Sequence, residues 1–250
     1  MTETARRVAI FGATSDIAIA FARRCAEARQ RLVLVGRDRA ALDRLAADLS
    51  VRGAPQVEVQ EADFARTAAL AAVAENAWTA LGGLDVALIA YGSLPDQARV
   101  SADAAEGEAA LALNFVSPAL LADALAARFE AQRTGTIAVI TSVAGDRGRQ
   151  SNYLYGAAKG GLQKFLEGLR HRLFKANVAV LDVRPGFVAT KMTAHLPQGG
   201  PLWATPEKVA GDMEAAIAKR GAVLYTPWFW FGIMAIVRNV PRPLFHRSKL

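Results

Sequence analysis

The sequence predicts an α/β protein with a single doubly wound domain, in which about seven parallel strands are flanked by helices. Short runs rich in Val, Ile and Leu alternate along the chain with longer Ala- and Leu-rich stretches of helical periodicity. Most of these runs are apolar at every position, as in a parallel sheet whose two faces are both covered. The length of 250 residues is enough for one such domain, and no linker, repeat or low-complexity block divides it.

The expected strands and helices follow one another in a regular order. The third strand is the weakest, because Glu58 and Gln60 alternate with its apolar residues. Strands are expected at residues 8–11, 32–35, 57–60, 86–90, 137–141, 178–183 and 223–225. Helices are expected near residues 17–29, 39–49, 67–81, 107–132, 152–175 and 206–218. In such a fold a ligand binds above the carboxyl ends of the strands.

Composition excludes several classes of protein. The chain is 52% hydrophobic and 21% charged, which is not the composition of a disordered protein. Its longest apolar stretch, residues 222–237, is shorter than the about 20 residues of a membrane-spanning helix, and the first residues show no secretory signal. We therefore expect a cytoplasmic location. The single cysteine, Cys25, excludes a disulfide framework and a cysteine-based metal cluster, so we expect a buried structural thiol and no metal site.

The net charge of +7 is concentrated near the carboxyl end. After Glu214 the chain carries six Lys or Arg residues, no Asp or Glu, and a run of aromatic residues. This mixture suits an anionic membrane surface better than a nucleic acid, so no nucleic-acid partner is expected. We interpret residues 1–226 as the domain and residues 227–250 as an extension. This extension contacts either the inner face of the membrane, which makes the protein peripheral, or another subunit of a homo-oligomer.

The first expected strand is followed by the turn Gly12-Ala13-Thr14-Ser15-Asp16-Ile17-Ala18 and then by a helix. A dinucleotide pyrophosphate fits such a place, because a glycine permits the tight turn and N–H groups at the helix N-terminus face the phosphates. Asp16 and Ala18 stand where further glycines are expected, and a carboxylate beside a pyrophosphate is repulsive. The alternative is that Ser15 or Asp16 only caps the helix. The residues of this turn that we expect to bind the cofactor are Gly12, Thr14, Ser15, Asp16 and Ile17.

The second expected strand leads into Gly36 and Arg37, where an NAD site usually has an acid that binds the ribose 2′-hydroxyl. The guanidinium of Arg37 can hold a 2′-phosphate, so NADP(H) is favoured and NAD(H) comes second. Asp38 either caps the next helix or reaches the ribose. After the third strand, Asp63 and Phe64 are candidates for contact with the adenine, although Asp63 could equally cap the following helix.

Four polar residues, three of them in the second half of the chain, form a candidate catalytic set. Tyr155 and Lys159 are four residues apart near the start of a helix, so both side chains lie on one face. A nearby ammonium is expected to lower the pKa of the phenol into a useful range. Ser142 follows a strand at the carboxyl edge of the sheet, where its hydroxyl can meet a substrate carbonyl; otherwise it is a strand-end cap. Asn114 lies within a long apolar helix and is either functional or a satisfied buried amide.

A turn after the sixth expected strand adds the residues Arg184-Pro185-Gly186-Phe187-Val188-Ala189-Thr190. Its backbone, at Pro185, Gly186 and Val188, is expected to approach a nicotinamide. Thr190 is expected to bind the carboxamide of that ring or a phosphate.

Together, in this order and at these spacings, these residues resemble the classical short-chain dehydrogenase/reductase superfamily over residues 7–190. The resemblance implies a Rossmann-type domain, a nicotinamide cofactor and hydride transfer between a ketone and a secondary alcohol. It implies that Tyr155 is the general acid in reduction and the base in oxidation, that Lys159 holds the nicotinamide ribose, and that Ser142 orients the carbonyl. It also implies that Asn114 holds a water in a proton relay to Lys159.

The chain departs from the pattern of this superfamily at two places in the cofactor site. The first turn lacks two of the usual glycines. The usual Asn-Asn-Ala-Gly after the fourth strand reads Ile89-Ala90-Tyr91-Gly92 here, so that only Gly92 is kept as a cofactor-binding residue. The support of the adenosine is therefore expected to differ.

A narrower resemblance concerns the substrate. The motifs GATSDIA (12–18), SVAGDR (142–147) and SNYLY (151–155), with the basic and aromatic extension, resemble the decaprenylphosphoryl-2-keto-erythro-pentose reductases. This implies a keto group on a lipid-linked sugar as substrate. Another hydrophobic ketone, such as a 3-oxoacyl chain, is the alternative within the enzymes, and a non-catalytic nucleotide-binding scaffold is the alternative outside them.

Four basic residues near the expected site could hold a substrate phosphate: Arg147, Arg149, Lys191 and His195. Each of them could also be a solvated loop residue. The fairly apolar residues 192–203, which contain Gly199 and Gly200, are expected to form a lid over the site; we call them the lid segment.

Overall fold

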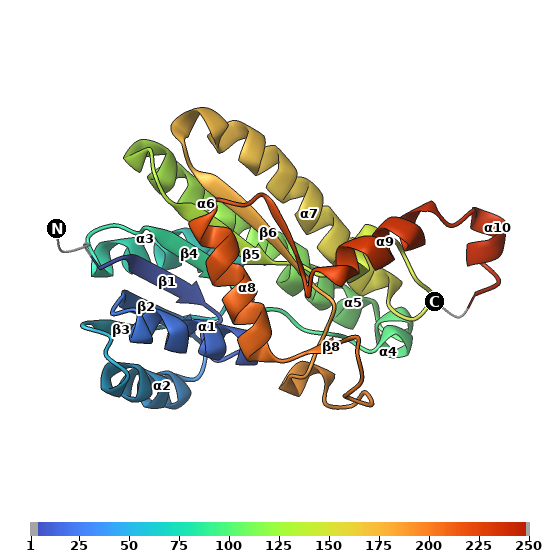
Figure 1. Ribbon diagram of the computed structural model, residues 1–250, viewed down its shortest axis with the longest axis horizontal. Helices are drawn as coiled ribbons and strands as arrows, with labels where there is room; N and C mark the ends of the chain where they lie inside the picture. Colours follow the sequence, from blue (N-terminus) through green and yellow to red (C-terminus); the bar gives the residue numbers. More distant parts are fainter. Residues whose placement is uncertain (1–4, 249–250) are drawn as a thin grey trace.

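A computed structural model describes residues 5–248, in which a seven-stranded parallel sheet has the strand order β3-β2-β1-β4-β5-β6-β9. The predicted fold class is confirmed, and Figure 1 shows the helices on both sides of this sheet. The first four residues of the expected domain, and Lys249 and Leu250 of the extension, lie outside the described residues. The seven strands are β1 (Arg7–Phe11), β2 (Arg31–Gly36), β3 (Val57–Glu61), β4 (Val86–Ile89), β5 (Thr136–Ile140), β6 (Ala179–Pro185) and β9 (Val223–Thr226).

Alternation along the strands divides the core into two layers, because successive side chains point to opposite faces. In β1, Val8 and Ile10 pack with α1, α2 and α8, whereas Ala9 and Phe11 pack with α3, α6 and α7. Cys25 on α1 is buried, which confirms the prediction of a structural thiol, and burial raises the pKa of that thiol. The helices of the two layers are α1 (Asp16–Glu27), α2 (Arg39–Val51), α3 (Leu70–Ala80), α6 (Ser117–Gln132), α7 (Tyr153–Leu173) and α8 (Pro206–Ala218).

Side-chain caps define several helix starts. The carboxylate of Asp38 accepts from the N–H of Ala41 at the start of α2, and the hydroxyl of Thr205 accepts from the N–H of Lys208 at the start of α8. Asp103 caps α5 (Ala104–Leu111) in the same way. Each such cap contributes about 1 kcal/mol. A further short helix, α4 (Gln97–Ala102), was not expected from the sequence and lies between the end of β4 and α5.

The long helix expected at 107–132 is interrupted. A π-helical stretch, Ala112–Val116, separates α5 from α6 and carries Asn114. Such wide turns are rare and recur at functional sites. The continuous run Ala104–Gln132 is long and apolar enough to cross a membrane by composition, but half of its apolar window is buried inside the domain. We therefore interpret it as a core helix.

The segment after β6 covers the carboxyl edge of the sheet. It begins with the short strand β7 (Phe187–Val188) and ends with the short strand β8 (Trp203–Ala204). The lid segment lies between them; it starts within a turn of 3-10 helix at Lys191–Thr193 and ends in β8. The two short strands pair in parallel, and the rings of Phe187 and Trp203 stack with centroids 5.3 Å apart. Trp203, the last residue of the lid segment, is thus held in place by the pairing of β8 with β7.

The extension continues as α9 (Phe229–Asn239) and α10 (Arg242–Phe245). Trp230, Met234 and Val237 bury one face of α9 against the domain, and α10 projects beyond the body of the molecule (Figure 1). Arg147 fastens this segment. Its Nη1 donates to the carbonyls of Val237 and Val240, the latter at 2.8 Å, and its guanidinium lies 3.7 Å from the centroid of the Phe245 ring.

We predict that Arg147→Ala loosens the extension and leaves the rest of the domain intact. Hydrogen bonds from a charged donor contribute about 1.5–3 kcal/mol each, so amide hydrogens in α9 and α10 should exchange at least about tenfold faster. Hydrogen exchange followed by mass spectrometry measures this, with the exposed Arg44→Ala as a control. Unchanged exchange in α9 and α10 would contradict the anchoring role.

Candidate active site

One cavity of about 770 Å³ lies at the carboxyl edge of the sheet, below the lid segment. It brings together the turn after β1, the ends of β2, β4 and β5, the start of α7 and the segment after β6. The expected site residues that line it are Gly12, Thr14, Ser15, Asp16, Ile17, Arg37, Phe64, Gly92, Asn114, Ser142, Arg149, Tyr155, Lys159, Pro185, Gly186, Val188, Thr190 and Lys191. Three expected residues do not line it: Asp63, Arg147 and His195.

The turn after β1 has the geometry that a phosphate needs. Gly12 has φ +83°, and a Cβ there would lie 2.8 Å from the backbone nitrogen of Tyr91, so only glycine fits. Ser15 occupies the N-cap position of α1, but its side chain does not cap the helix. Its Oγ is buried without a hydrogen-bond partner among the described residues. A buried unpartnered hydroxyl at a helix N-terminus fits a bound phosphate oxygen.

Asp16 has a role that the sequence did not reveal. Its carboxylate accepts from the N–H of Lys191 at 2.6 Å, and the Lys191 ammonium lies 3.9 Å from its other oxygen. The expected repulsion between this carboxylate and a pyrophosphate is reduced, because the charge is engaged with these two donors. Asp16 thereby ties the start of α1 to the residue that directly precedes the lid segment.

The adenosine side of the cavity contains an aromatic pair. The rings of Phe64 and Tyr91 stack with centroids 3.9 Å apart and planes within 2° of parallel. The Tyr91 hydroxyl lies 2.9 Å from the hydroxyl of Ser117, which donates to the Phe64 carbonyl. Tyr91 stands where the family pattern has the alanine of Asn-Asn-Ala-Gly. The sequence marked Tyr91 as a departure but gave no sign that Phe64 would be its partner.

Two acidic residues that the sequence placed near the cofactor, Asp38 and Asp63, accept hydrogen bonds from nearby backbone N–H groups. Asp38 lines the cavity, but its carboxylate is used to cap α2. Asp63 is exposed outside the cavity, where it accepts from the N–H of Ala65 at 3.0 Å. The exposed side chain of Arg37 lines the cavity beside Gly36.

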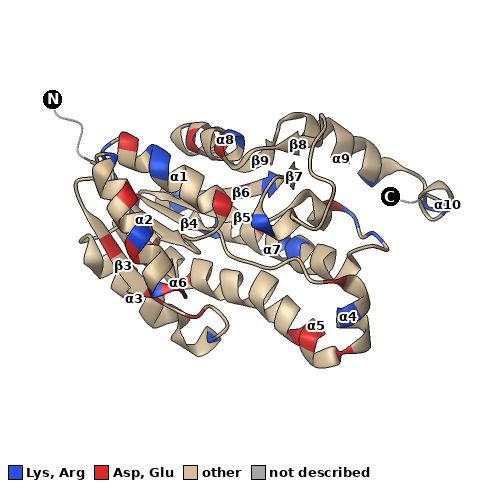
Figure 2. Cartoon of the chain, turned by 90° about the horizontal axis from the view of Figure 1, so that it is seen from below, with Lys and Arg blue, Asp and Glu red and all other residues tan. Residues whose placement is uncertain are grey.

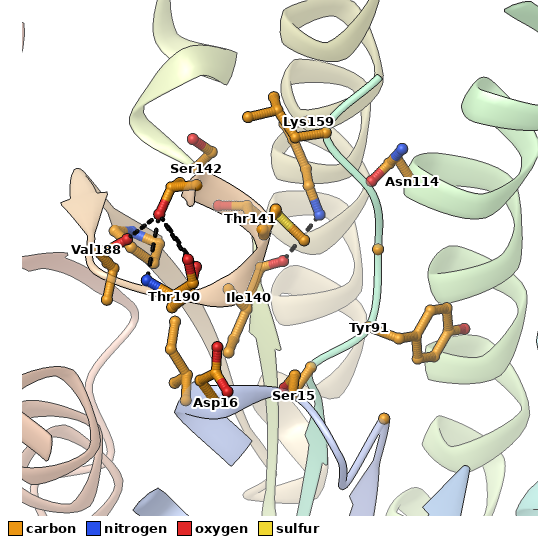
Figure 3. Close-up of a pocket in the computed structure, with 18 of the residues that line it drawn as sticks. Ser15, Asp16, Tyr91, Asn114, Ile140, Thr141, Ser142, Lys159, Val188 and Thr190 are labelled. Carbon is orange, nitrogen blue, oxygen red and sulfur yellow. Dashed lines mark hydrogen bonds between the residues drawn. The ribbon is translucent and has the colours of Figure 1, made fainter. Parts of the chain in front are cut away.

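The ammonium of Lys159 is buried at the centre of the site. It donates to the carbonyl of Ile140, at the end of β5, at 3.1 Å (Figure 3). Burial lowers the pKa of Lys159 to about 8, and the negative charge of Asp182 opposes that shift. The ammonium lies 5.8 Å from the centroid of the Tyr155 ring.

Asn114 lies on the other side of the segment that follows β4 (Figure 3). Its side chain is 1% exposed, its Oδ1 accepts from the N–H of Ser93 at 3.0 Å, and its Nδ2 donates to the carbonyl of Ala110 at 2.9 Å. A Cβ at Gly92 would lie 2.7 Å from this Oδ1 and 3.5 Å from the Lys159 ammonium. Glycine at this position therefore lets the chain pass between the amide and the ammonium.

The hydroxyls of Tyr155 and Ser142 face the same cavity. Burial raises the pKa of Tyr155 to about 12, and a hydrogen bond with Ser142 opposes that shift. The sequence predicted a lowered pKa from the nearby ammonium, and this direction is wrong. Desolvation outweighs the cation, whose hydrogen bond goes to Ile140. Tyr155 is consequently protonated at neutral pH.

A buried charged network supports the segment that carries Ser142. Asp182 is fully buried; it accepts from the hydroxyl of Thr141, the residue before Ser142, and from Arg184 Nε at 2.7 Å. Arg184 also donates to Asp146 at 3.0 Å and to the Tyr225 hydroxyl at 2.9 Å. Sequence reasoning missed this network, because its members come from β6, β9 and the stretch after β5.

The four basic residues expected near the substrate do not converge. Arg149 lines the cavity, whereas Lys191 is exposed at its edge beside Asp16. Arg147 turns towards the extension, as described above, and His195 is exposed outside the cavity. Among residues 5–248, no group of three or more His, Cys, Asp or Glu side chains is placed to hold a metal ion.

The parallel sheet, the glycine turn and the polar cluster at its carboxyl edge define a Rossmann-type protein of the dinucleotide-dependent oxidoreductase class. The sequence model of the short chain dehydrogenase family matches residues 6–200. The chain is 36% identical over 240 residues to an uncharacterized oxidoreductase of Mycobacterium tuberculosis (strain H37Rv), covering 96% of both proteins. It is 32% identical over 250 residues to an uncharacterized oxidoreductase of Streptomyces coelicolor, covering 97% of this chain and 95% of that protein. The chain therefore belongs to the short-chain dehydrogenase family.

Solved structures agree with this assignment. A short-chain dehydrogenase from Sphingobium yanoikuyae in complex with NADPH superposes with a TM-score of 0.81 and is 27% identical, covering 94% of this chain and 96% of that one. A bulky-bulky ketone specific alcohol dehydrogenase from Comamonas testosteroni has the same fold, with a TM-score of 0.80 at 24% identity and 96% coverage of both chains.

We predict that Lys159→Met stabilises the protein in a pH-dependent way. The folded pKa of about 8 lies below the ordinary lysine value of about 10.4, so burial of the charged form costs stability. That cost is fully present below pH 8 and disappears as the pH rises towards the unfolded value. The variant should therefore gain unfolding free energy at pH 6.5 and lose most of this gain by pH 10.

Urea unfolding of the variant and the wild type at both pH values measures this gain. Lys164→Met, at an exposed position of the same helix, is the control and should show no such trend. A gain at pH 10 equal to that at pH 6.5 would show that the ammonium is not the cause.

Proposed function

We propose that the protein reduces a ketone to a secondary alcohol with NADP(H), or catalyses the reverse oxidation. The observation that supports this most is the placement of Asn114, Ser142, Tyr155 and Lys159 in one cavity with the glycine turn. A protein that only bound a nucleotide would have no need of this set. A non-catalytic scaffold is therefore the weaker alternative.

The residues of the cavity fit a nicotinamide dinucleotide. The unpartnered Oγ of Ser15 and the turn at Gly12 suit the pyrophosphate, and Pro185, Gly186, Val188 and Thr190 line the nicotinamide end. Arg37 favours NADP(H) over NAD(H), because Asp38, the nearby acid, is engaged as a helix cap. The structural relative crystallised with NADPH is consistent with this preference.

Bound NADPH would supply the hydride to the carbonyl carbon. Tyr155, which is protonated at neutral pH, would donate its proton to the carbonyl oxygen as that oxygen gains negative charge. The Ser142 hydroxyl would hold the same oxygen in place. The Lys159 ammonium would stabilise the phenolate that remains and bind the ribose, and Asn114 would hold a water that returns a proton by way of Lys159.

For the substrate, we propose a keto group on a sugar or lipid-linked sugar, such as a decaprenylphosphoryl-2-keto-pentose. The lining of the cavity includes the apolar side chains Leu94, Phe187, Met192 and Leu196, which suits a molecule with a hydrocarbon part. Another hydrophobic ketone, such as a 3-oxoacyl chain, is the alternative.

We predict that Tyr155→Phe reduces ketone-dependent NADPH oxidation by at least about a hundredfold, because a positioned proton donor contributes about 10²–10⁴-fold. NADPH binding, followed by nicotinamide fluorescence, should stay within about threefold of the wild type. The exposed Tyr153, two residues earlier, gives the matched control Tyr153→Phe, which should keep its activity. Undiminished turnover by Tyr155→Phe would rule out its role as proton donor.

We also propose that residues 1–226 act as the catalytic domain and that the extension, residues 227–250, places the protein at the cytoplasmic face of a membrane. Trp228, Phe231 and Ile236 are 79%, 59% and 71% exposed on or next to α9. Figure 2 shows basic and no acidic residues on α9 and α10, in agreement with the sequence. Exposed aromatic residues beside arginines suit an anionic lipid surface. A subunit interface in a homo-oligomer is the alternative occupant of the same face.

We predict that the protein floats with vesicles that contain phosphatidylglycerol and not with pure phosphatidylcholine. The double variant Trp228→Ser and Phe231→Ser should lose this binding. Phe174→Ser, which alters an aromatic residue that is 79% exposed elsewhere, should keep it. The membrane proposal is wrong if the wild type, the double variant and Phe174→Ser all stay in the soluble fraction. If the double variant then also changes the oligomeric state, the exposed face of α9 is a subunit interface.

A further inference from the structure

The cavity is lined by a guanidinium that has no ion-pair partner among the described residues. This is Arg149, and burial lowers its pKa. Its Nη2 donates to the thioether sulfur of Met234 on α9 at 3.3 Å, and its Nε is buried without a partner among the described residues. A thioether is a weak acceptor, so the guanidinium is poorly satisfied where it lies.

The acid nearest to Arg149 is already engaged. Asp146 accepts from Arg184 at 3.0 Å and from the Tyr225 hydroxyl at 2.7 Å. It contributes only a distant electrostatic attraction to Arg149. Burying a charged donor without a hydrogen-bonded acceptor is costly, and such a group in a cavity wall indicates that a ligand supplies the acceptor.

A second unpartnered polar atom lies close along the chain. Asn152 occupies the N-cap position of α7, where an asparagine normally accepts from the helix, but its side chain makes no cap. Its Oδ1 is buried without a partner among the described residues, and it lines the same cavity. Its backbone N–H donates to the Arg149 carbonyl at 3.2 Å, which holds the two residues in one turn. Asn152 directly precedes α7 and lies three residues before Tyr155 in the sequence.

We propose that Arg149 and Asn152 form a subsite that binds an anionic group of the substrate, a phosphate or a carboxylate, next to a substrate hydroxyl. The anion accepts from Arg149 Nε, and the hydroxyl donates to Asn152 Oδ1. This rests on the proposed function, because it describes the part of the substrate that lies beyond the keto group. Arg149 shares the lining of the cavity with apolar side chains that include Leu94, Val143, Phe187 and Met192.

Two pairs of ketones test the subsite: ribulose 5-phosphate against ribulose, and levulinate against methyl levulinate. Titration calorimetry on the complex of the protein with NADP⁺ measures their binding without turnover, and NADPH oxidation measures their reduction. The anionic member of a pair should bind at least about tenfold more tightly. If only the first pair shows a preference for the anion, the subsite binds a phosphate. If only the second pair shows it, the subsite binds a carboxylate.

In the pair for which the wild type prefers the anion, Arg149→Gln should bring the affinities for the anionic and the neutral ketone within about threefold of each other. Arg149→Lys should keep part of the preference for the anion. Asn152→Leu should weaken the binding of ribulose and of ribulose 5-phosphate, and it should leave the binding of levulinate unchanged. Arg44→Gln, at an exposed position of α2, is the control for an unrelated loss of charge.

The subsite is refuted if the wild type binds both members of each pair equally, or if Arg149→Gln retains the preference. If the anion preference follows Arg149 but no ketone is reduced, the subsite stands and the reductase assignment falls. If ketones are reduced with no anion preference, the reductase assignment stands and the subsite falls.

Discussion

The site is organised around the buried ammonium of Lys159. Water is largely excluded from it, and this desolvation disfavours its charge. The surrounding groups that favour the charge come from separate elements: the Ile140 carbonyl at the end of β5 and the Asp182 carboxylate on β6. Gly92, after β4, lets the chain pass without separating the ammonium from the Asn114 amide. The sheet order β1-β4-β5-β6 makes these strand ends neighbours, so the cation depends on the whole topology.

The same desolvation sets the protonation state of Tyr155. A phenol beside an ammonium in water would lose its proton more readily, yet the buried phenol of this protein holds its proton more tightly. A protonated tyrosine is the state that a carbonyl reduction requires at the start of the reaction. In the proposed reaction Tyr155 would be the proton donor, and the nearby cation would stabilise the charge that develops when the proton leaves.

The extension and the site share one set of contacts. Arg184 forms ion pairs with Asp182 and with Asp146, and all three side chains are mostly buried. Loss of one partner would leave a buried charge uncompensated. Tyr225 joins this network and packs its ring edge-on against Phe231 of α9, with centroids 5.6 Å apart. Arg147 and Arg149 also reach α9, through backbone carbonyls and through Met234. Arg149 therefore links the lining of the cavity to a segment that the sequence indicated only as a membrane or subunit contact.

The sequence by itself determined the seven strands of the main sheet, its covered faces and the polar residues at its carboxyl edge, because apolar periodicity and strand ends are local properties. Only the tertiary structure decided the direction of each loop side chain. Arg147 and Arg149 are two residues apart with the same charge, but one fastens the extension and the other faces the cavity. Asp16 and Tyr91 likewise acquired their roles from Lys191 and Phe64, which are distant along the chain. Such partners are set by packing between elements, and a pattern within one element carries no record of them.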